Sequence, residues 1–171
     1  MSLLRQSIAS GTLWIAYGVL AALNDEATCQ APCETGGVLL GYWTGDDDPV
    51  VTHGLGPGPD AMHCEERFKP DHDYHVSEIA RLYKASNRRL HYLGDWHSHP
   101  AGGGWLSELD RTCLRSIARC RDARVERPLM LILAGGSDWH PFAWRYNGIR
   151  RWLLRHSLVV RPLAVCPFRT Q

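Results

Sequence analysis

The chain has 171 residues, of which 44% are hydrophobic and 22% are charged. This is the size and composition of one ordinary globular domain with its own core. The 19 Lys and Arg residues balance the 18 Asp and Glu residues to a net charge of +1, so the sequence offers no electrostatic attraction to nucleic acid or to an acidic membrane. We expect a single domain over residues 1–171 and neither of these partners.

No membrane span or secretory signal peptide is expected from the sequence. The longest apolar stretch, residues 13–23, is interrupted by Tyr17 and Gly18 and has about half of the roughly 20 residues that a span needs. The first residues carry one Arg, and no cleavage site of small residues follows an apolar region. We therefore expect a cytoplasmic protein whose six cysteines are free thiols, because the cytosol is reducing.

The first half of the chain predicts strands around one helix. Residues 12–16 alternate as in a short strand, and the apolar residues that follow, up to Ala27, repeat with helical spacing. The apolar runs 36–43 and 50–55 flank an acidic turn, which is typical of a β-hairpin. In residues 56–73, Pro, Gly and charged residues dominate without a period, so this stretch predicts a loop.

In the second half, two helices are predicted between strands. The first helix runs from about Val76 to about Asn87, and the second opens at Ser107, which has the position of a helix N-cap. Residues 149–156 have a helical pattern and residues 158–165 an extended one. The intervening strands are predicted over residues 90–96, 128–134 and 139–146. This order favours an α/β fold, an α-β-α sandwich with a mixed central sheet flanked by helices.

Two histidines stand two residues apart at the end of the predicted strand 90–96. In an extended chain, this spacing places the imidazoles of His97 and His99 on one face, as two ligands of one metal ion require. Asp110 lies in the first turn of the next helix, and the Gly-rich loop 101–104 can fold its carboxylate back to the same ion. These residues form a candidate His/His/Asp metal site.

Hydrolytic zinc sites hold the ion with three protein ligands and leave the fourth position to water, whose pKa falls to about 7. Such a site also needs a base. Glu34, just before the predicted strand 36–43, is the candidate that takes the proton of the water and delivers it to the leaving amine. Ser107 is placed to donate a hydrogen bond to the oxyanion that forms on the attacked carbonyl.

These residues together resemble the signature of a known enzyme family. The sequence His-Ser-His-Pro at 97–100, then Ser107 after six residues and Asp110 after two more, resembles the complete motif of the JAB/MPN/JAMM zinc metalloproteases, and Glu34 completes it. The resemblance implies that the two histidines and the aspartate bind one zinc ion, that Glu34 is the acid/base, and that Ser107 stabilises the intermediate. It also implies the cytidine-deaminase-like α-β-α sandwich of that family.

A longer resemblance covers residues 60–110, with Arg-Phe-Lys-Pro-Asp at 67–71 and Tyr-Leu-Gly-Asp-Trp-His-Ser-His-Pro at 92–100. It is similar to the stand-alone bacterial subgroup, whose members accompany ubiquitin-like conjugation enzymes in anti-phage operons, including CBASS. The resemblance implies an isopeptidase that cuts after the C-terminus of a ubiquitin-like modifier or a CD-NTase conjugated to a target protein. Companion ubiquitin-activating and ubiquitin-conjugating-like enzymes are implied as partners, and operons with their own ubiquitin-like protein stay an alternative source.

Two other functions remain open from the sequence. A peptidase that processes a sulfur-carrier or ubiquitin-like precursor would share the same site, so only its substrate or its genomic neighbours would distinguish it. A non-catalytic MPN interaction module would have lost ligands, and this chain has kept all of them.

Ser107 and Asp110 also match a capping box, in which the serine accepts a hydrogen bond from the backbone and the acid reaches back. A carboxylate that binds zinc cannot cap fully. We therefore favour the ligand role for Asp110 and leave Ser107 shared between the two roles.

Cys29 and Cys33 could form a second, structural zinc site with His63 and Cys64, although a Cys-x-x-x-Cys pair is a loose match to the usual spacing. The alternative is that these cysteines are ordinary thiols.

Trp105 and the glycines 102–104 border the candidate site, where a narrow modifier tail would pass. The alternative is that the loop is only flexible and that Trp105 packs on the core.

Four arginines form a group near the end of the chain: Arg145, Arg150, Arg151 and Arg155. Such a group is more typical of a solvated face than of a docking patch.

Overall fold

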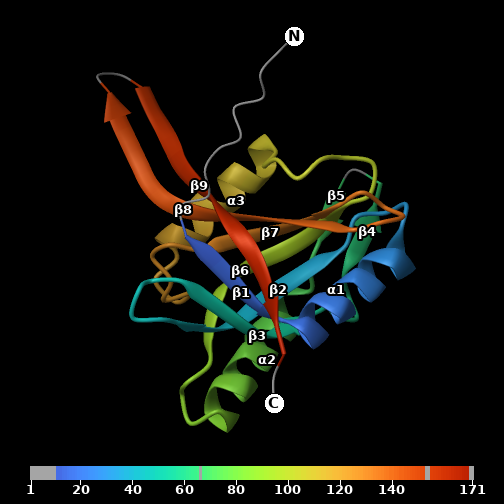
Figure 1. The fold of residues 1–171 in the computed structure, drawn as a ribbon, viewed down its shortest axis with the longest axis horizontal. Helices are drawn as coiled ribbons and strands as arrows, with labels where there is room; N and C mark the ends of the chain where they lie inside the picture. The colour runs from blue at the N-terminus through green and yellow to red at the C-terminus, as the bar shows by residue number, and fades with distance from the viewer. Residues whose placement is uncertain (1–10, 66, 153–154, 170–171) are drawn as a thin grey trace.

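The computed structural model describes residues 11–65, 67–152 and 155–169. Three helices are interspersed among the strands of the described chain (Figure 1). In chain order the elements are β1 (Thr12–Ala16), α1 (Tyr17–Gln30), β2 (Gly36–Trp43), β3 (Pro49–Leu55), β4 (Met62–Cys64), β5 (Arg67–Lys69), α2 (His72–Ala85), β6 (His91–His99), α3 (Glu108–Arg119), β7 (Leu129–Ala134), β8 (His140–Trp152) and β9 (Arg155–Phe168).

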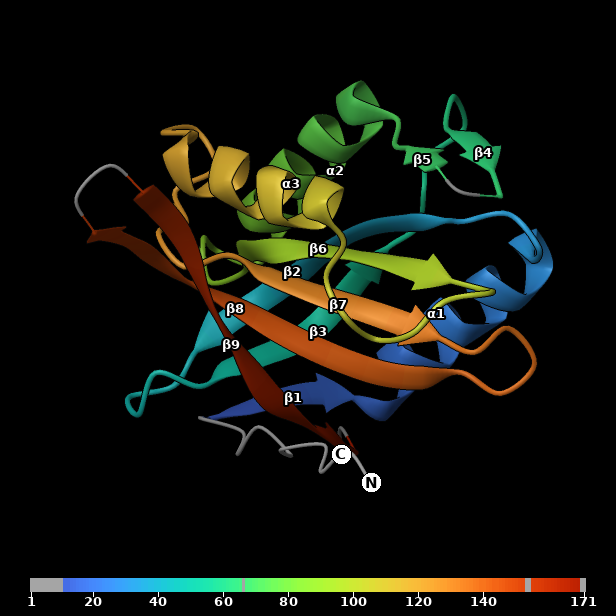
Figure 2. The ribbon, with the colours of Figure 1, turned by 90° about the horizontal axis from the view of Figure 1, so that it is seen from above.

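The main sheet closes on itself in the order β1-β3-β2-β6-β7-β8-β9. It is mixed, because β1 runs parallel to both β3 and β9 and β6 runs parallel to β7, whereas the other neighbours are antiparallel. Figure 2 shows α2 and α3 together over β6, with the β4–β5 hairpin beside them and α1 at another side of the sheet. The predicted α/β fold, a mixed sheet flanked by helices, is confirmed. The closure of the sheet was not predicted.

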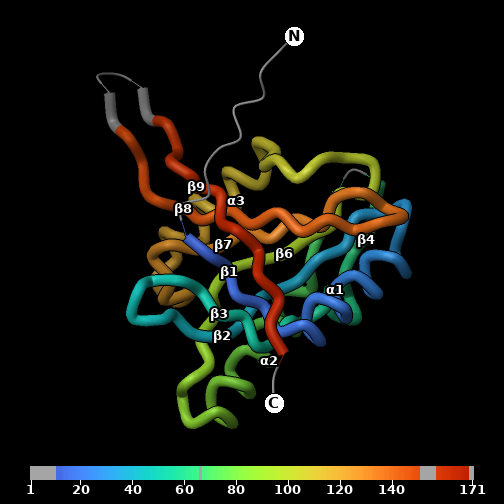
Figure 3. Tube along the Cα trace, in the orientation of Figure 1, coloured from blue at the N-terminus to red at the C-terminus, as the bar shows by residue number. Residues whose placement is uncertain are grey.

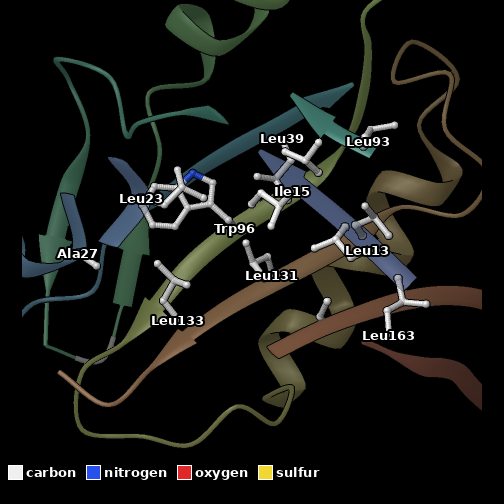
Figure 4. Packing of buried hydrophobic residues seen from close by; sticks show 13 residues of the cluster. Leu13, Ile15, Leu23, Ala27, Leu39, Leu93, Trp96, Leu131, Leu133 and Leu163 are labelled. Atoms are coloured by element: carbon white, nitrogen blue, oxygen red, sulfur yellow. The ribbon is translucent and has the colours of Figure 1, made fainter. Parts of the chain in front are cut away.

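The interior of the barrel holds the larger hydrophobic core. Its buried side chains come from almost every strand of the sheet and from α1, and Figure 4 shows them converging around Trp96. The indole of Trp96 is 1% exposed, and its Nε1–H donates to the carbonyl of Leu55 at 2.9 Å. A second cluster lies under α3 and includes Leu114, Met130 and Ile132. Strand β7 is buried on both faces and so separates the two clusters.

The helices α2 and α3 begin at residues whose side chains cap them, whereas α1 begins without a side-chain cap. Asp71 accepts the backbone N–H of Tyr74 at 3.0 Å and so caps α2. Ser107 caps α3, as its position predicts. The helices α1 and α2 have 14 residues each, and within the described ranges no helix is both long and apolar enough to span a bilayer.

Most of the predicted elements are present, with two corrections. Residues 56–73, predicted to be a loop, contain the hairpin β4–β5 and the start of α2. Residues 149–156 are not helical where the structure describes them, because β8 extends to Trp152 and β9 starts at Arg155. In this stretch Ile149 pairs with Leu158 and Trp152 pairs with Arg155, so pairing between the two strands overrides the local spacing of the apolar residues.

Strands β8 and β9 form a long antiparallel ribbon that extends beyond the barrel (Figure 3). At its base, Arg145 is 7% exposed and donates through Nη1 to the carbonyl oxygen of Asp47 at 2.8 Å. The prediction that Arg145 lies on a solvated face is therefore wrong. Arg145 instead joins β8 to the turn between β2 and β3. Arg150 is exposed, and the side chains of residues 151–156 lie outside the described part of the structure.

Candidate metal centre

The end of β6 and the first turn of α3 bring three predicted residues together. The Nε2 atoms of His97 and His99 lie 2.9 Å apart. One carboxylate oxygen of Asp110, Oδ1, lies 3.2 Å from His97 Nε2, and the other, Oδ2, lies 3.8 Å from His99 Nε2. One atom of each side chain that could bind a metal lies within 4.8 Å of the others. The cluster therefore has the size of a single-ion site.

The tautomer of His99 follows from its backbone contact. Nδ1 lies 2.9 Å from the carbonyl oxygen of Gly103, and because that oxygen can only accept, Nδ1 must carry the proton. Burial lowers the pKa of His99 below its ordinary value, an effect opposed by the bond to Gly103. Nε2 of the neutral ring therefore carries the lone pair and faces Nε2 of His97 and, at a longer distance, Asp110. Metal-binding histidines are commonly oriented by a carbonyl in this way.

Asp110 caps the helix through Oδ2 and faces His97 through Oδ1. The backbone N–H of Ser107 donates to Oδ2 at 2.7 Å, and the N–H of Asp110 donates to Ser107 Oγ at 3.2 Å. The predicted capping box is thus confirmed, while Oδ1 faces His97. Burial alone would raise the pKa of Asp110, but the hydrogen bond and charge of His97 and the bonds from Ser107 outweigh it and lower that pKa well below the usual range.

Glu34 precedes β2 in a segment whose backbone is bonded on both sides. On one side, Thr35 N–H donates to Ser98 Oγ at 3.0 Å, and Ser98 N–H donates to the carbonyl of Thr35 at 2.8 Å. On the other side, Glu34 N–H donates to the carbonyl of Cys64 at 2.8 Å, and Nδ1 of His63 donates to the carbonyl of Glu34 at 3.0 Å. The backbone of Glu34 is therefore fixed between β6, next to the two histidines, and β4.

Glu34, His97 and Asp110 line one cavity of about 600 Å³. The lining also includes Phe68 and other residues of the β4–β5 hairpin, and the exposed Leu109 of α3. The sequence did not predict the contribution of this hairpin. Its strands have three residues each, which is too short for a period-2 pattern to be recognised.

A second polar group lies beside the cluster on the same strand. Asp95 accepts a hydrogen bond from the hydroxyl of Tyr92 at 2.5 Å and one from the thiol of Cys113 at 3.7 Å. Burial raises the pKa of Asp95, and burial together with the charge of Asp95 raises the pKa of Cys113 to about 12. The thiol is therefore a proton donor at neutral pH. These residues were not predicted, although Asp95 stands as far before His97 as His99 stands after it.

The glycine loop packs between aromatic rings. A Cβ atom on Gly104 would collide with the ring of Phe142, and the carbonyl of Gly104 accepts from Trp144 Nε1 at 2.8 Å. Trp105 is 69% exposed and so does not pack on the core, which excludes one of the two interpretations of this residue. The loop is held by specific contacts rather than merely flexible.

The possible second zinc site is not formed. Cys29 and Cys64 are exposed thiols and Cys33 is half-buried, while Nδ1 of His63 contacts the carbonyl of Glu34. In the described ranges, the cluster of the two β6 histidines and Asp110 is the single group of three or more His, Cys, Asp or Glu residues close enough to share an ion.

Comparisons with known proteins agree on one family. The family model described as "Prokaryotic homologs of the JAB domain" matches residues 17–152. The protein named probable metalloprotease y4qB of Sinorhizobium fredii is 38% identical over 92% of this chain and 98% of its own. A protein of Escherichia coli named CD-NTase/cGAS isopeptidase is 34% identical over 70% of this chain and 74% of its own. A protein of Desulfitobacterium hafniense with a solution structure shares the fold, with a TM-score of 0.66 at 17% identity over 93% of this chain and 94% of its own.

Proposed function

The chain belongs to the prokaryotic homologs of the JAB domain, and on this premise we propose that it is a zinc-dependent isopeptidase that removes a ubiquitin-like modifier or a CD-NTase from a target protein. The chain is a hydrolase of the metalloprotease type, as its family and its named relatives indicate. The observation that carries the proposal is the convergence of His97, His99 and Asp110, of which His97 and Asp110 line the same cavity as Glu34.

The donor set fits zinc. Two imidazole nitrogens 2.9 Å apart, next to an ionised carboxylate, form a group whose lone pairs a cation would satisfy. Imidazole and carboxylate ligands suit Zn²⁺, and three protein ligands leave a position for water or substrate. We assign His97, His99 and Asp110 as the residues that hold the ion. When bound, zinc lowers the pKa of a water to about 7 and polarises the substrate carbonyl.

Glu34 and Ser107 have separate roles in the proposed reaction. Glu34 takes the proton of the attacking water and delivers it to the leaving lysine amine. Ser107 stabilises the oxyanion: its Oγ accepts from the N–H of Asp110, which leaves the hydroxyl hydrogen to donate to that oxyanion. The same cavity is also lined by the apolar side chains of Phe68 and Leu109.

The relatives support the substrate class. The Escherichia coli relative carries the name CD-NTase/cGAS isopeptidase, and we transfer this activity to the present chain as part of the proposal. The substrate is then the C-terminal tail of a CD-NTase or ubiquitin-like protein joined to a lysine, and companion ubiquitin-like conjugation enzymes of a CBASS-type anti-phage operon supply it in the cytoplasm.

A cleavage assay tests this proposal. The candidate tail, taken from the CD-NTase or ubiquitin-like protein encoded nearest to this chain, is joined by an isopeptide bond to a lysine-containing target and incubated with the zinc-loaded protein. We expect mass spectrometry to show cleavage directly after the C-terminal residue of the tail and a chelator to stop it. If the conjugate of the CD-NTase tail and that of the ubiquitin-like tail both stay intact although zinc is bound to the protein, the assignment of the substrate is overturned.

A matched substrate distinguishes the proposed activity from precursor processing. The same tail followed by a short linear peptide extension presents an α-amide instead of an isopeptide bond. Faster cleavage of the lysine conjugate is expected, and cleavage of the linear extension alone would favour a processing peptidase.

A further inference from the structure

Strand β6 and helix α3 are joined by two polar contacts, and only one of them belongs to the proposed metal site. The first joins His97 Nε2 to Asp110 Oδ1 at 3.2 Å. The second joins Cys113 Sγ to Asp95 Oδ2 at 3.7 Å. Both Asp95 and Cys113 are half-buried and line the cavity beside the cluster. The second contact therefore lies on the same face of the sheet, next to the first.

The spacing of the two contacts matches the geometry of the two elements. Asp95 and His97 are two apart on a strand, so they share a face and lie about 6.6 Å apart along it. Asp110 and Cys113 are three apart on a helix, so they also share a face, with a rise of about 4.5 Å between them. Two contacts in register fix both the position of α3 along β6 and the rotation of α3 about its own axis.

The side chain of Asp95 is itself held by Tyr92. The hydroxyl of Tyr92 donates to Asp95 Oδ1 at 2.5 Å, so each carboxylate oxygen accepts one bond. Residues three apart on a regular strand point to opposite faces, but β2 pairs Leu39 with Gly94 and Leu40 with Tyr92, and the register shifts there. This bulge adds one residue to β6 and places Tyr92 and Asp95 on the same face.

The apolar contacts of α3 do not fix its register by themselves. Leu114 is fully buried in the cluster with Met130 and Ile132 of β7. Apolar contacts of this kind are non-directional, whereas a hydrogen bond is restricted in distance and angle. Ligands of a metal centre have to be held to within about 0.5 Å. The helix that carries Asp110 therefore needs a directional contact in addition to its apolar face.

We propose that Asp95 is a positioning residue of the metal centre: through Cys113 it holds α3 so that the carboxylate of Asp110 stands against His97. This inference rests on the proposed function, because it assumes that Asp110 binds the ion. Asp95 takes no part in the reaction itself. Its effect is on the arrangement of the ligands before the ion binds, and so on the affinity for zinc.

The test measures zinc affinity by competition with a chromogenic chelator, together with the Tm of the metal-free protein. Cys113→Ala removes the donor, and we expect zinc binding to weaken about tenfold, the lower end of the range for residues that orient ligands. Cys113→Ser restores a donor, and an affinity within about threefold of the wild type is expected. Cys166→Ala, which removes another half-buried thiol on β9, is the control and should bind zinc as the wild type does.

Asp95→Leu provides a second test that does not change the helix. The leucine side chain has a similar shape but accepts no hydrogen bond, so the contact with Cys113 is lost and a loss similar to that of Cys113→Ala is expected. Because both changes break the same contact, the double variant should lose little more than either single variant.

Equal zinc affinity in Cys113→Ala and the wild type would overturn the inference. It would also be overturned if Cys113→Ser bound zinc as weakly as Cys113→Ala, since a general packing effect would then explain both. Fully additive losses in the double variant would show that Asp95 and Cys113 act separately and would overturn it as well. A wild-type chain that binds no zinc would instead overturn the proposed function, on which the inference rests.

Discussion

At the scale of single residues, the proposed reaction depends on Glu34, whose backbone is bonded to β6 on one side and to β4 on the other. In Glu34→Gln the side chain keeps its shape but loses the ability to take up and deliver a proton. We expect turnover to fall by about 10²–10⁴-fold, the usual contribution of a general acid/base, while zinc binding is unchanged. Initial rates on the lysine conjugate and the zinc content of both proteins provide the measurement.

The control for this change is Glu126→Gln, which alters an exposed glutamate outside the cavity. Its activity should equal that of the wild type. Retention of wild-type turnover in Glu34→Gln would contradict the role of this residue as acid/base.

The lowered pKa of Asp110 predicts that the stability of the protein depends on pH. The pKa of Asp110 in the folded protein lies below its ordinary value of 3.8. A carboxyl with a lowered pKa in the folded state stabilises the fold at pH values above its unfolded pKa, and this contribution is lost as the pH falls through its folded pKa. Urea unfolding of the metal-free protein should therefore show a loss of stability below pH 3.8 that is smaller in Asp110→Asn. Identical acid dependence in both proteins would contradict the depressed pKa.

The residues of the site could be predicted from the sequence to the extent that they form a spaced motif. His97, His99 and Asp110 were chosen from their spacing, and the structure brings them together, although their roles stay predictions. Cys113 could not be chosen in the same way, because a single cysteine on a helix carries no signal of its own. Its partner Asp95 stands next to the histidine motif in the sequence. The bulge that turns Tyr92 towards Asp95, however, depends on the pairing of β6 with β2, which no local pattern shows.

At the scale of elements, the bulge in β6 makes Gly94 a critical residue. Its φ is +149°, and a Cβ atom there would collide with the backbone of Leu129 on β7. We expect Gly94→Ala to destabilise the protein by about 3 kcal/mol or more, because the change forces β6 and β7 apart or strains the backbone. Urea or thermal unfolding measures the effect.

Gly18 provides the matched control for this prediction. It lies in α1, and no atom lies within 4 Å of a Cβ built on it, so Gly18→Ala should be neutral or stabilising, by up to about 1 kcal/mol. Equal effects of the two substitutions would contradict the account of the bulge.

The elements themselves differ in how far local patterns determine them. The hairpin of β2 and β3 and the helix α3 were predicted because each has its own periodicity and its own turn or cap. The β4–β5 hairpin is held to the site by contacts with Glu34, which local periodicity does not contain. The region that starts at Ile149 is predicted to be helical from its local apolar spacing, but its pairing with β9 makes it extended.

At the scale of the whole molecule, the sheet closes through a pairing between the two ends of the described chain. Strand β1 pairs in parallel with β9, and Thr12 stands opposite Ala164. Because this contact joins segments at opposite ends of the sequence, periodicity within a window cannot predict it. The α/β class could be predicted from the order of elements, but the closed form of the sheet could not.

Metal binding affects the stability of the whole fold. An ion that binds only the folded chain stabilises it by about 2.7 kcal/mol at a free concentration 100 times its Kd, which for a domain of this size raises Tm by roughly 5–10 °C. We expect this shift on addition of zinc and its reversal by a chelator, measured by thermal unfolding. In His97→Ala the shift should be absent, and a shift of equal size in that variant would place the binding of zinc elsewhere on the protein.

The most direct test of the central claim, that His97, His99 and Asp110 hold one zinc ion, is the zinc content per chain of the purified proteins, measured by plasma mass spectrometry. The wild type and Glu34→Gln should each contain about one zinc per chain, and His97→Ala and Asp110→Ala should contain little. A wild-type chain without zinc, or full occupancy in His97→Ala, would contradict the claim.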